Sequence, residues 1–138
     1  MLKTETHLPL LARKAFPSFR VAIISDALAG RNGVGTYYQD LAQHLRNVGV
    51  GVEFICPTSE RDRSFESFRI PLPGDATQAM VYPKRNRLRE RLDRFRPHIV
   101  LIPTLGPYSF IGAQEAHRRK IPICMGHHTD FEKLTKLY

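Results

Sequence analysis

The chain has 138 residues, of which 42% are hydrophobic and 25% are charged. This length is enough for one domain but not for two, and the composition is that of an ordinary globular protein. No apolar run reaches the ~18 residues of a membrane-spanning helix, and residues 1–19 lack the apolar core of a signal peptide, so we expect a cytoplasmic protein. The net charge of +8 favours an anionic partner, which can be a phosphorylated substrate, an acidic membrane or nucleic acid.

The most informative segment reads strand, glycine loop, helix. Residues 1–19 form an N-terminal extension, and Arg20–Asp26 is a short apolar run typical of a buried parallel strand. A glycine-rich loop, Ala27–Gly35, leads into Thr36–Val48, whose apolar residues have helical spacing, and Gly49 suits a helix C-cap. Backbone N–H groups at such a helix start can bind an anion. The unit therefore predicts a phosphate-bearing ligand and a doubly wound α/β fold.

Two other ligand loops do not fit these glycines. A dinucleotide fingerprint would need a third glycine where Tyr38 stands, and an acid where the second predicted strand, residues 51–56, ends in Cys56. No P-loop sequence is present either. A tight glycine turn without any ligand stays open as the alternative.

The middle of the chain predicts a short third strand. Phe68–Pro73 has strand-like residues, and its prolines place it at a sheet edge or in an irregular segment. Residues 58–66 and Gly74–Pro83 read as loops. With a strand order of 3-2-1-4-5, Cys56 and Cys124 lie about three strand spacings apart, roughly 14 Å, which is too far for a disulfide. We expect both cysteines to be small buried residues.

Lys84–Arg96 is predicted to be a strongly basic helix. Leu88, Leu92 and Phe95 form its apolar stripe, and around them stand seven basic against two acidic side chains. Such a run is either a solvated face or a surface for an anionic bilayer, where each cation adds about 1 kcal/mol. No nucleic-acid reader module is present, so we expect no nucleic-acid partner. The candidate membrane contacts are Lys84, Arg85, Arg87 and Arg91.

The second half continues the strand and helix alternation. His98–Ile102 is the fourth predicted strand, Ser109–Arg119 the next helix, and Ile121–Gly126 the fifth strand. The last residues, 132–138, begin another helix. This alternation predicts a mostly parallel sheet with helices on both faces.

Ligands of open α/β sheets bind at the carboxyl ends of the strands, at the point where strand order reverses. Three segments should converge there, namely Gly30–Gly35, Thr104–Ser109 and His127–Asp130. Asp26 ends the first strand and points to the same place, where it either binds a ligand hydroxyl or holds loop amides. For Tyr108 and Phe110 we favour packing beneath the following helix over lining a pocket.

A metal site is not expected. His127 and His128 are neighbours in an extended stretch, so their side chains point to opposite faces and do not share an ion easily. No cofactor is expected either. His128 alone reads as a site residue that donates to, or orients, a ligand hydroxyl or phosphate oxygen, or as a structural histidine at a strand end.

Four segments in order resemble the N-terminal half of a family-four glycosyltransferase of GT-B fold. They correspond to the family's first strand with its glycine loop, its third strand, the approach to its fourth strand, and its fifth strand with a histidine motif. In this sequence they are residues 20–36, 68–74, 92–100 and 121–131. The resemblance implies a single, incomplete Rossmann-like N-terminal domain over residues 20–138.

The resemblance also implies roles for individual residues. Asn32, Gly33 and Gly35 match the loop near the donor diphosphate and the acceptor, and His128 matches the histidine near the reacting sugar. The residues that shape the same site are Thr129 and Asp130. Family members transfer a sugar from a nucleotide sugar, usually with retention and without a metal. The candidate acceptor-loop residues are Thr104, Gly106 and Tyr108. Leu101 and Pro103 depart from the histidines of many relatives, so the acceptor-loop chemistry is expected to be atypical.

The family's nucleotide-binding C-terminal domain has no counterpart in these 138 residues. We therefore expect no transfer activity from this chain alone, and a partner domain in cis or trans. The leading hypothesis is the acceptor-side domain of a retaining glycosyltransferase, cytoplasmic or peripheral at the inner membrane face, that acts on a lipid or polyol. The alternatives are a non-catalytic Rossmann-like anion-binding module and, more weakly, a nucleic-acid-associated protein.

Overall fold

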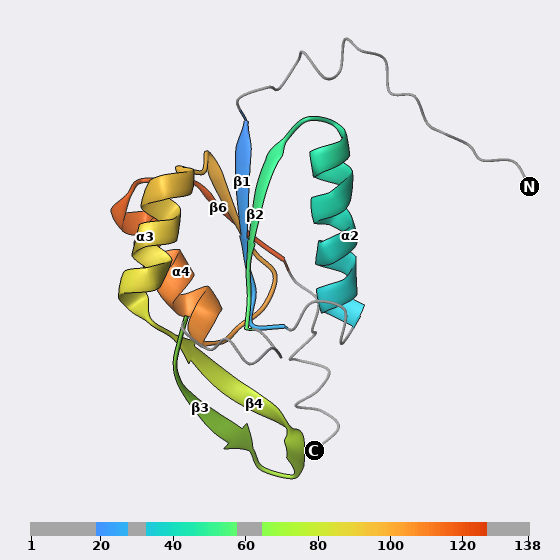
Figure 1. Ribbon diagram of the computed structural model, residues 1–138, viewed down its shortest axis with the longest axis vertical. Coiled ribbons are helices and arrows are strands. Elements are labelled where there is room, and N and C mark those ends of the chain that lie inside the picture. The colour runs from blue at the N-terminus through green and yellow to red at the C-terminus, as the bar shows by residue number, and fades with distance from the viewer. Residues whose placement is uncertain (1–18, 28–32, 58–64, 127–138) are drawn as a thin grey trace, which may run out of the picture.

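The computed structural model describes residues 19–27, 33–57 and 65–126 (Figure 1). Expectations for Asn32, His128, Thr129 and Asp130, for the extension and for a last helix lie outside these residues. The strands are β1 (Arg20–Ile24), β2 (Gly51–Ile55), β3 (Glu66–Leu72), β4 (Asp75–Pro83), β5 (Ile99–Ile102) and β6 (Ile123–Met125). The helices are α2 (Gly33–Asn47), α3 (Arg85–Phe95) and α4 (Pro107–Arg118).

The main sheet has four strands in the order β2-β1-β5-β6, and every neighbouring pair is parallel. Helix α2 covers one face, and α3 and α4 cover the other (Figure 1). The strand order reverses between β1 and β5, as a doubly wound sheet requires. The predicted α/β fold with a Rossmann-like, mostly parallel sheet is confirmed.

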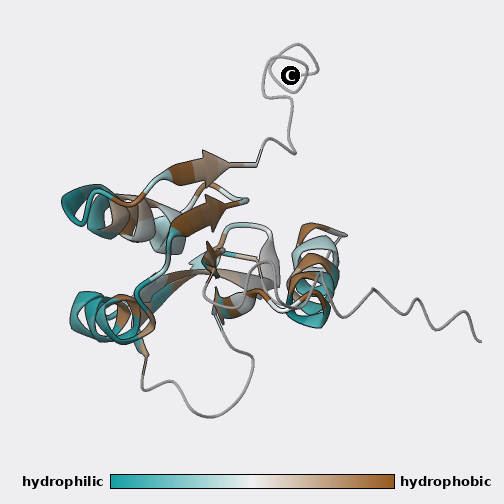
Figure 2. Ribbon diagram, turned by 90° about the horizontal axis from the view of Figure 1, so that it is seen from above, coloured by the Kyte–Doolittle hydropathy of each residue, from teal (hydrophilic) through white to brown (hydrophobic). Residues whose placement is uncertain are grey.

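Alternation along β1 explains why helices are needed on both faces. Ala22 and Ile24 pack with α3 and α4, whereas Val21 and Ile23 pack against α2. All four side chains are almost fully buried. Apolar residues follow the strands, and polar residues follow the outer faces of the helices (Figure 2). The continuous apolar run in the sequence is thus a strand buried on both sides.

The third strand is not part of the main sheet, and the predicted loop after it is wrong. β3 pairs antiparallel with β4 in a separate two-stranded hairpin, which lies beyond the end of the main sheet (Figure 1). Leu72 pairs with Asp75 across a two-residue turn of Pro73 and Gly74, and Gly74 has a φ of 85°. Proline presets the first turn position, and glycine supplies the positive φ of the second. This dipeptide was the sequence signal for a hairpin.

Helix α2 begins three residues earlier than predicted, so Gly33 and Gly35 belong to its first turn and not to the loop. The apolar face of the helix also differs from the prediction. Tyr38 is buried, whereas Tyr37, which was expected on the apolar face, is 57% exposed. Helix α3 matches its prediction closely, with Leu88 and Leu92 buried as expected.

The two cysteines do not form a disulfide, as expected, but neither of them is fully buried. Cys56 follows β2 and is half-buried, and Cys124 on β6 is exposed. β2 and β6 are the two outer strands of the main sheet, so the cysteines lie at opposite edges. The prediction of two buried cysteines is wrong for Cys124, because β6 is an edge strand whose three side chains are all exposed.

Candidate functional site

The carboxyl ends of β1 and β5 meet at one edge of the sheet, which we call the rim. Asp26 lies two residues after β1, and its carboxylate accepts hydrogen bonds from the backbone N–H groups of Tyr108 (2.7 Å) and Ser109 (3.2 Å). It also accepts from the Ser109 hydroxyl at 2.6 Å. The Asp26 N–H donates to Thr104 Oγ1 at 2.8 Å. These bonds tie the end of β1 to the start of α4.

The geometry favours one of the two roles open to Asp26. Both carboxylate oxygens are engaged by the first turn of α4, where N–H groups have no partner within the helix and the helix dipole favours an anion. Asp26 therefore has the second role, in which its carboxylate binds backbone amides and fixes the start of α4 at the rim.

Gly106 is required by this contact. A Cβ at Gly106 would lie 2.5 Å from Asp26 Cγ and 2.7 Å from each carboxylate oxygen. No side chain larger than hydrogen fits at that distance without moving the carboxylate. Gly106 thus lets Asp26 approach the start of α4.

Tyr108 is a core residue, as the packing hypothesis predicted. Its side chain is 1% exposed and stacks on Phe65, with ring centroids 6.1 Å apart. Burial, together with the charge of Glu66, raises the pKa of the Tyr108 phenol, so it stays protonated. The packing prediction is wrong for Phe110, which is 65% exposed because it lies on the outer side of α4.

The hairpin places an apolar surface beside the rim. Phe68 pairs with Tyr82 and Ile70 with Met80 across the hairpin, and the Phe68 and Tyr82 rings stack at 4.3 Å. Residues two apart on a strand share a face, so these side chains form one apolar stripe. Phe68 is 51% exposed and Ile70 47% exposed. The hairpin is attached at the rim through Phe65, which stacks on Tyr108.

The sequence profile of Glycosyltransferase Family 4 matches residues 31–138, from the start of α2 to the end of the chain. The chain belongs to this family. No curated protein and no solved structure matches it. The match covers the β5–α4 loop and the residues that follow β6, so two of the three segments expected at the rim lie wholly within it.

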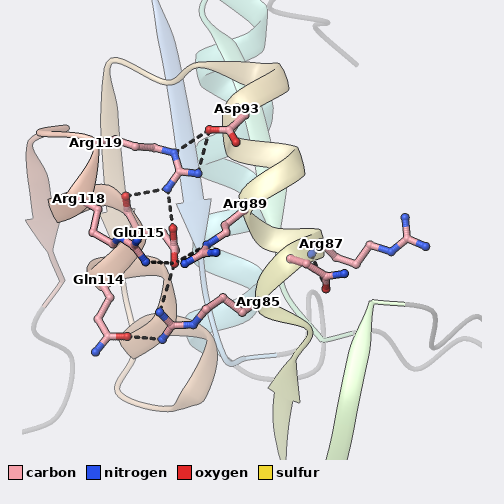
Figure 3. A network of polar contacts seen from close by, with 9 residues as sticks. Arg85, Arg87, Arg89, Asp93, Gln114, Glu115, Arg118 and Arg119 are labelled. Atoms are coloured by element: carbon pink, nitrogen blue, oxygen red, sulfur yellow. Dashed lines mark hydrogen bonds and ion pairs between the residues drawn. The ribbon is translucent and has the colours of Figure 1, made fainter.

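In this family 4 domain the basic helix is bound to acidic partners. Glu115 of α4 is 1% exposed and lies among arginines from both helices (Figure 3). Arg119 Nη1 approaches it to 2.7 Å, Arg89 Nε to 3.0 Å and Arg85 Nη1 to 3.3 Å. Burial by itself would raise the Glu115 pKa, but hydrogen bonds from Arg119 and Arg89, and their charges, lower it below its ordinary value.

Glu115 is the residue that sequence reasoning missed. Its arginine partners on α3 lie 26 and 30 positions away in the chain, and only the packing of α3 on α4 brings them together. The sole local signal is an acidic residue among the small residues of an otherwise buried helix face, since Gly112 and Ala116 are also buried.

The four candidate membrane residues are therefore not equivalent. Arg85 pairs with Glu115 and Gln114, and Arg91 pairs with Glu53 and lies over the Phe65 ring. Arg87 lies 3.4 Å from Glu90, and both side chains are 53% exposed. Lys84 stands at the N-cap of α3, next to the hairpin. Much of the predicted surplus charge is thus neutralised within the domain.

Two absences hold for the residues that the structure describes. No group of three or more His, Cys, Asp or Glu side chains among residues 19–27, 33–57 and 65–126 is arranged to hold a metal ion. Within the same ranges, every helix is too short or too polar to cross a membrane.

Proposed function

We propose that this family 4 domain is the acceptor-side half of a retaining glycosyltransferase, which uses a nucleotide sugar as donor. The observation that carries the proposal is the family match over residues 31–138. It is joined to the geometry of the rim, where β1 and β5 end and α2 begins (Figure 1). A second, nucleotide-binding domain in cis or trans completes the enzyme, so the 138 residues alone are inactive. The domain works in the cytoplasm.

The start of α2 supports binding of the donor diphosphate or the acceptor. Gly33 and Gly35 lie in the first turn, and among the described residues no atom lies within 4 Å of the place where a Gly33 Cβ would be. A ligand can therefore approach the backbone closely at Gly33. The N–H groups and dipole of a helix start favour a negatively charged oxygen.

Acceptor binding depends indirectly on three residues at the rim, Asp26, Thr104 and Gly106. They hold the β5–α4 loop at a fixed distance from the end of β1, through the hydrogen bonds of the Asp26 carboxylate. Such a frame positions an acceptor without touching the reacting atoms. His128 is the residue we assign to the reaction, together with Asn32, Thr129 and Asp130 as its neighbours, on the strength of the family resemblance.

The apolar stripe supports a lipid over a soluble polyol as acceptor. Phe68, Ile70 and Met80 offer exposed apolar surface beside the rim, and Leu105 in the β5–α4 loop is 68% exposed. An acyl chain or bilayer surface matches these side chains, whereas a polyol does not. Lys84 is the N-cap of α3 directly after β4, and Arg87 lies in the first turn of α3, so both can contact anionic headgroups at the inner membrane face.

The catalytic proposal is tested on the protein expressed from its full reading frame. Sugar transfer from radiolabelled nucleotide sugars to lipid extracts and to polyols is measured for wild type, His128→Ala and His127→Ala. We expect His128→Ala to reduce turnover by about 10²–10⁴-fold and His127→Ala to retain most of it. Equal activity of both variants, with unchanged thermal unfolding, would remove His128 from the mechanism.

The membrane part is tested by co-sedimentation of the chain with vesicles of phosphatidylcholine alone or with anionic lipid. We expect binding to anionic vesicles that weakens in high salt and is lost in Phe68→Ser. Ile123→Ser is the control, because Ile123 is exposed on the edge strand β6 and not on the stripe. Equal binding to neutral and anionic vesicles, or equal losses in both variants, would refute the membrane contact.

A further inference from the structure

The two strands of the hairpin meet at Phe65. This residue directly precedes β3, and its carbonyl oxygen accepts a hydrogen bond of 2.7 Å from the N–H of Lys84, which directly follows β4. The first pair of the hairpin itself is Glu66 with Pro83. Phe65 therefore closes the base of the hairpin, and contacts that hold Phe65 also hold the point from which both strands extend.

The ring of Phe65 contacts two parts of the main domain. It stacks on the ring of Tyr108 at the start of α4, with centroids 6.1 Å apart and planes inclined by 24°. The guanidinium carbon of Arg91 on α3 lies 5.6 Å from the Phe65 centroid, a distance at which a cation and an aromatic face attract each other. Arg91 Nε donates in turn to Glu53 Oε1 of β2 at 2.6 Å. Phe65 is thus joined to α4 directly and to β2 through α3.

Tyr108 connects Phe65 to the rim. Its side chain is 1% exposed, and its backbone N–H donates to the Asp26 carboxylate at 2.7 Å. A continuous chain of contacts therefore runs from the end of β1, through Asp26 and Tyr108, to the base of the hairpin. The position of this base is in that way fixed relative to the β5–α4 loop.

The hairpin also packs on the core through β4. Val81 is 5% exposed within the core, and Ala79 packs against it. By contrast, five of the seven residues of β3 are exposed. A two-stranded ribbon that is held along one strand can still rotate about that strand. The Phe65 ring, at the start of the other strand, opposes this rotation and so determines the angle at which the hairpin leaves the rim.

This angle decides where the apolar stripe lies. Phe68 is an exposed residue of the stripe three positions after Phe65, which is at most about 10 Å along the strand. Ile70 continues the stripe away from the rim on the same face. An apolar tail that lies along the stripe keeps a constant distance from the β5–α4 loop only while the angle is constant.

We propose that Phe65 is a positioning residue, which fixes the angle between the hairpin and the rim and so sets the place of a lipid tail relative to the β5–α4 loop. The proposal rests on the proposed function, because a lipid on the apolar stripe is part of that function. Phe65 does not touch the reacting atoms. It acts through the orientation of the stripe, since a small misplacement of a bound acceptor is enough to slow a transfer.

The first experiment measures the angle itself, without lipid or donor. Residual dipolar couplings of backbone amides in the 138-residue chain report the orientation of the hairpin relative to the main sheet. Wild type is compared with Phe65→Leu, Phe65→Tyr and Phe95→Leu. Phe95 is the matched control, because it is also a partly buried aromatic residue on the same core but belongs to α3. We expect only Phe65→Leu to change the couplings of β3 and β4 relative to those of β1 and β5. If Phe65→Leu does not fold, Phe65→Met takes its place.

The second experiment compares the depths of the stripe and the rim in a bilayer. The chain contains no tryptophan, so Phe68→Trp on the stripe and Leu105→Trp in the β5–α4 loop each report one place. Their depths are measured by quenching with brominated lipids in vesicles of phosphatidylcholine and phosphatidylglycerol. We expect Phe65→Leu to change the difference between the two depths, and Phe65→Tyr and Phe95→Leu to keep it as in wild type.

Unchanged hairpin couplings in Phe65→Leu, or equal changes in Phe65→Leu and Phe95→Leu, would overturn the proposal. A changed angle that leaves the difference between the two depths as in wild type would overturn its consequence for the lipid tail. No vesicle binding by wild type would refute the lipid part of the proposed function together with that consequence. In that case the couplings would still decide whether Phe65 sets the angle, so the two failures are distinguishable.

Discussion

Replacement of Glu115 by glutamine tests whether the buried carboxylate holds α3 against α4. The substitution keeps the shape of the side chain but removes the charge that faces Arg85, Arg89 and Arg119. Breaking a buried ion pair on one side costs about 3–5 kcal/mol. The arginine side chains are 22–41% exposed, so water can solvate them after the carboxylate is removed, and this reduces the loss of stability. We therefore expect a loss of about 2–3 kcal/mol at neutral pH.

The assay is urea and thermal unfolding followed by circular dichroism. With an unfolding entropy of about 2.1 cal/mol/K per residue, the expected loss lowers Tm by about 7–10 °C. Glu90→Gln is the matched control on α3, because it removes one exposed carboxylate that lies 3.4 Å from Arg87. An exposed pair contributes about 0–1 kcal/mol, so this variant should unfold close to wild type.

The pH dependence gives a second check on the same residue. The folded-state pKa of Glu115 lies below its ordinary value of 4.5, so its stabilising contribution is present above pH 4.5 and is lost as pH falls through the folded-state pKa. The difference between wild type and Glu115→Gln should therefore shrink in acid. A Glu115→Gln variant that unfolds like Glu90→Gln at pH 7, or a difference that does not change with pH, would refute the reasoning.

Three further predictions concern the rim and the edge strand. Gly106→Ala should destabilise the domain by about 1–3 kcal/mol in urea unfolding, because the new Cβ meets the Asp26 carboxylate. Gly33→Ala is the control and should be neutral or slightly stabilising, because no described atom lies within 4 Å of its Cβ position. Equal effects of the two variants would contradict this prediction. Asp26→Asn should cost about 2 kcal/mol, since an amide NH₂ would face a backbone N–H of α4, and an unchanged urea midpoint would count against the assigned role. Thiol labelling should modify exposed Cys124 before Cys56, and the fast phase should vanish in Cys124→Ser; a single rate for both thiols would contradict the burial difference.

Local sequence patterns were sufficient to predict a strand or helix where burial of its apolar residues is the main requirement. A run such as Arg20–Ile24 must be buried on both faces, and helix α3 shows its apolar stripe at Leu88 and Leu92. The order of the four main-sheet strands agrees with the usual order of a doubly wound sheet, apart from the third strand. The hairpin was missed because its strands bury little, so the apolar pattern was weak and the signal lay only in the turn residues Pro73 and Gly74.

By itself the sequence determined the parallel sheet, its helices and the family, because hydrophobic periodicity and residue order act over short stretches of chain. Only the tertiary structure decided the roles of the charged residues. Asp26 caps a helix that starts more than 80 residues later, and Glu115 gathers arginines from a different helix. Electrostatic partners are set by distance in space, and burial decides how strongly they interact, so neither can be read from positions along the chain.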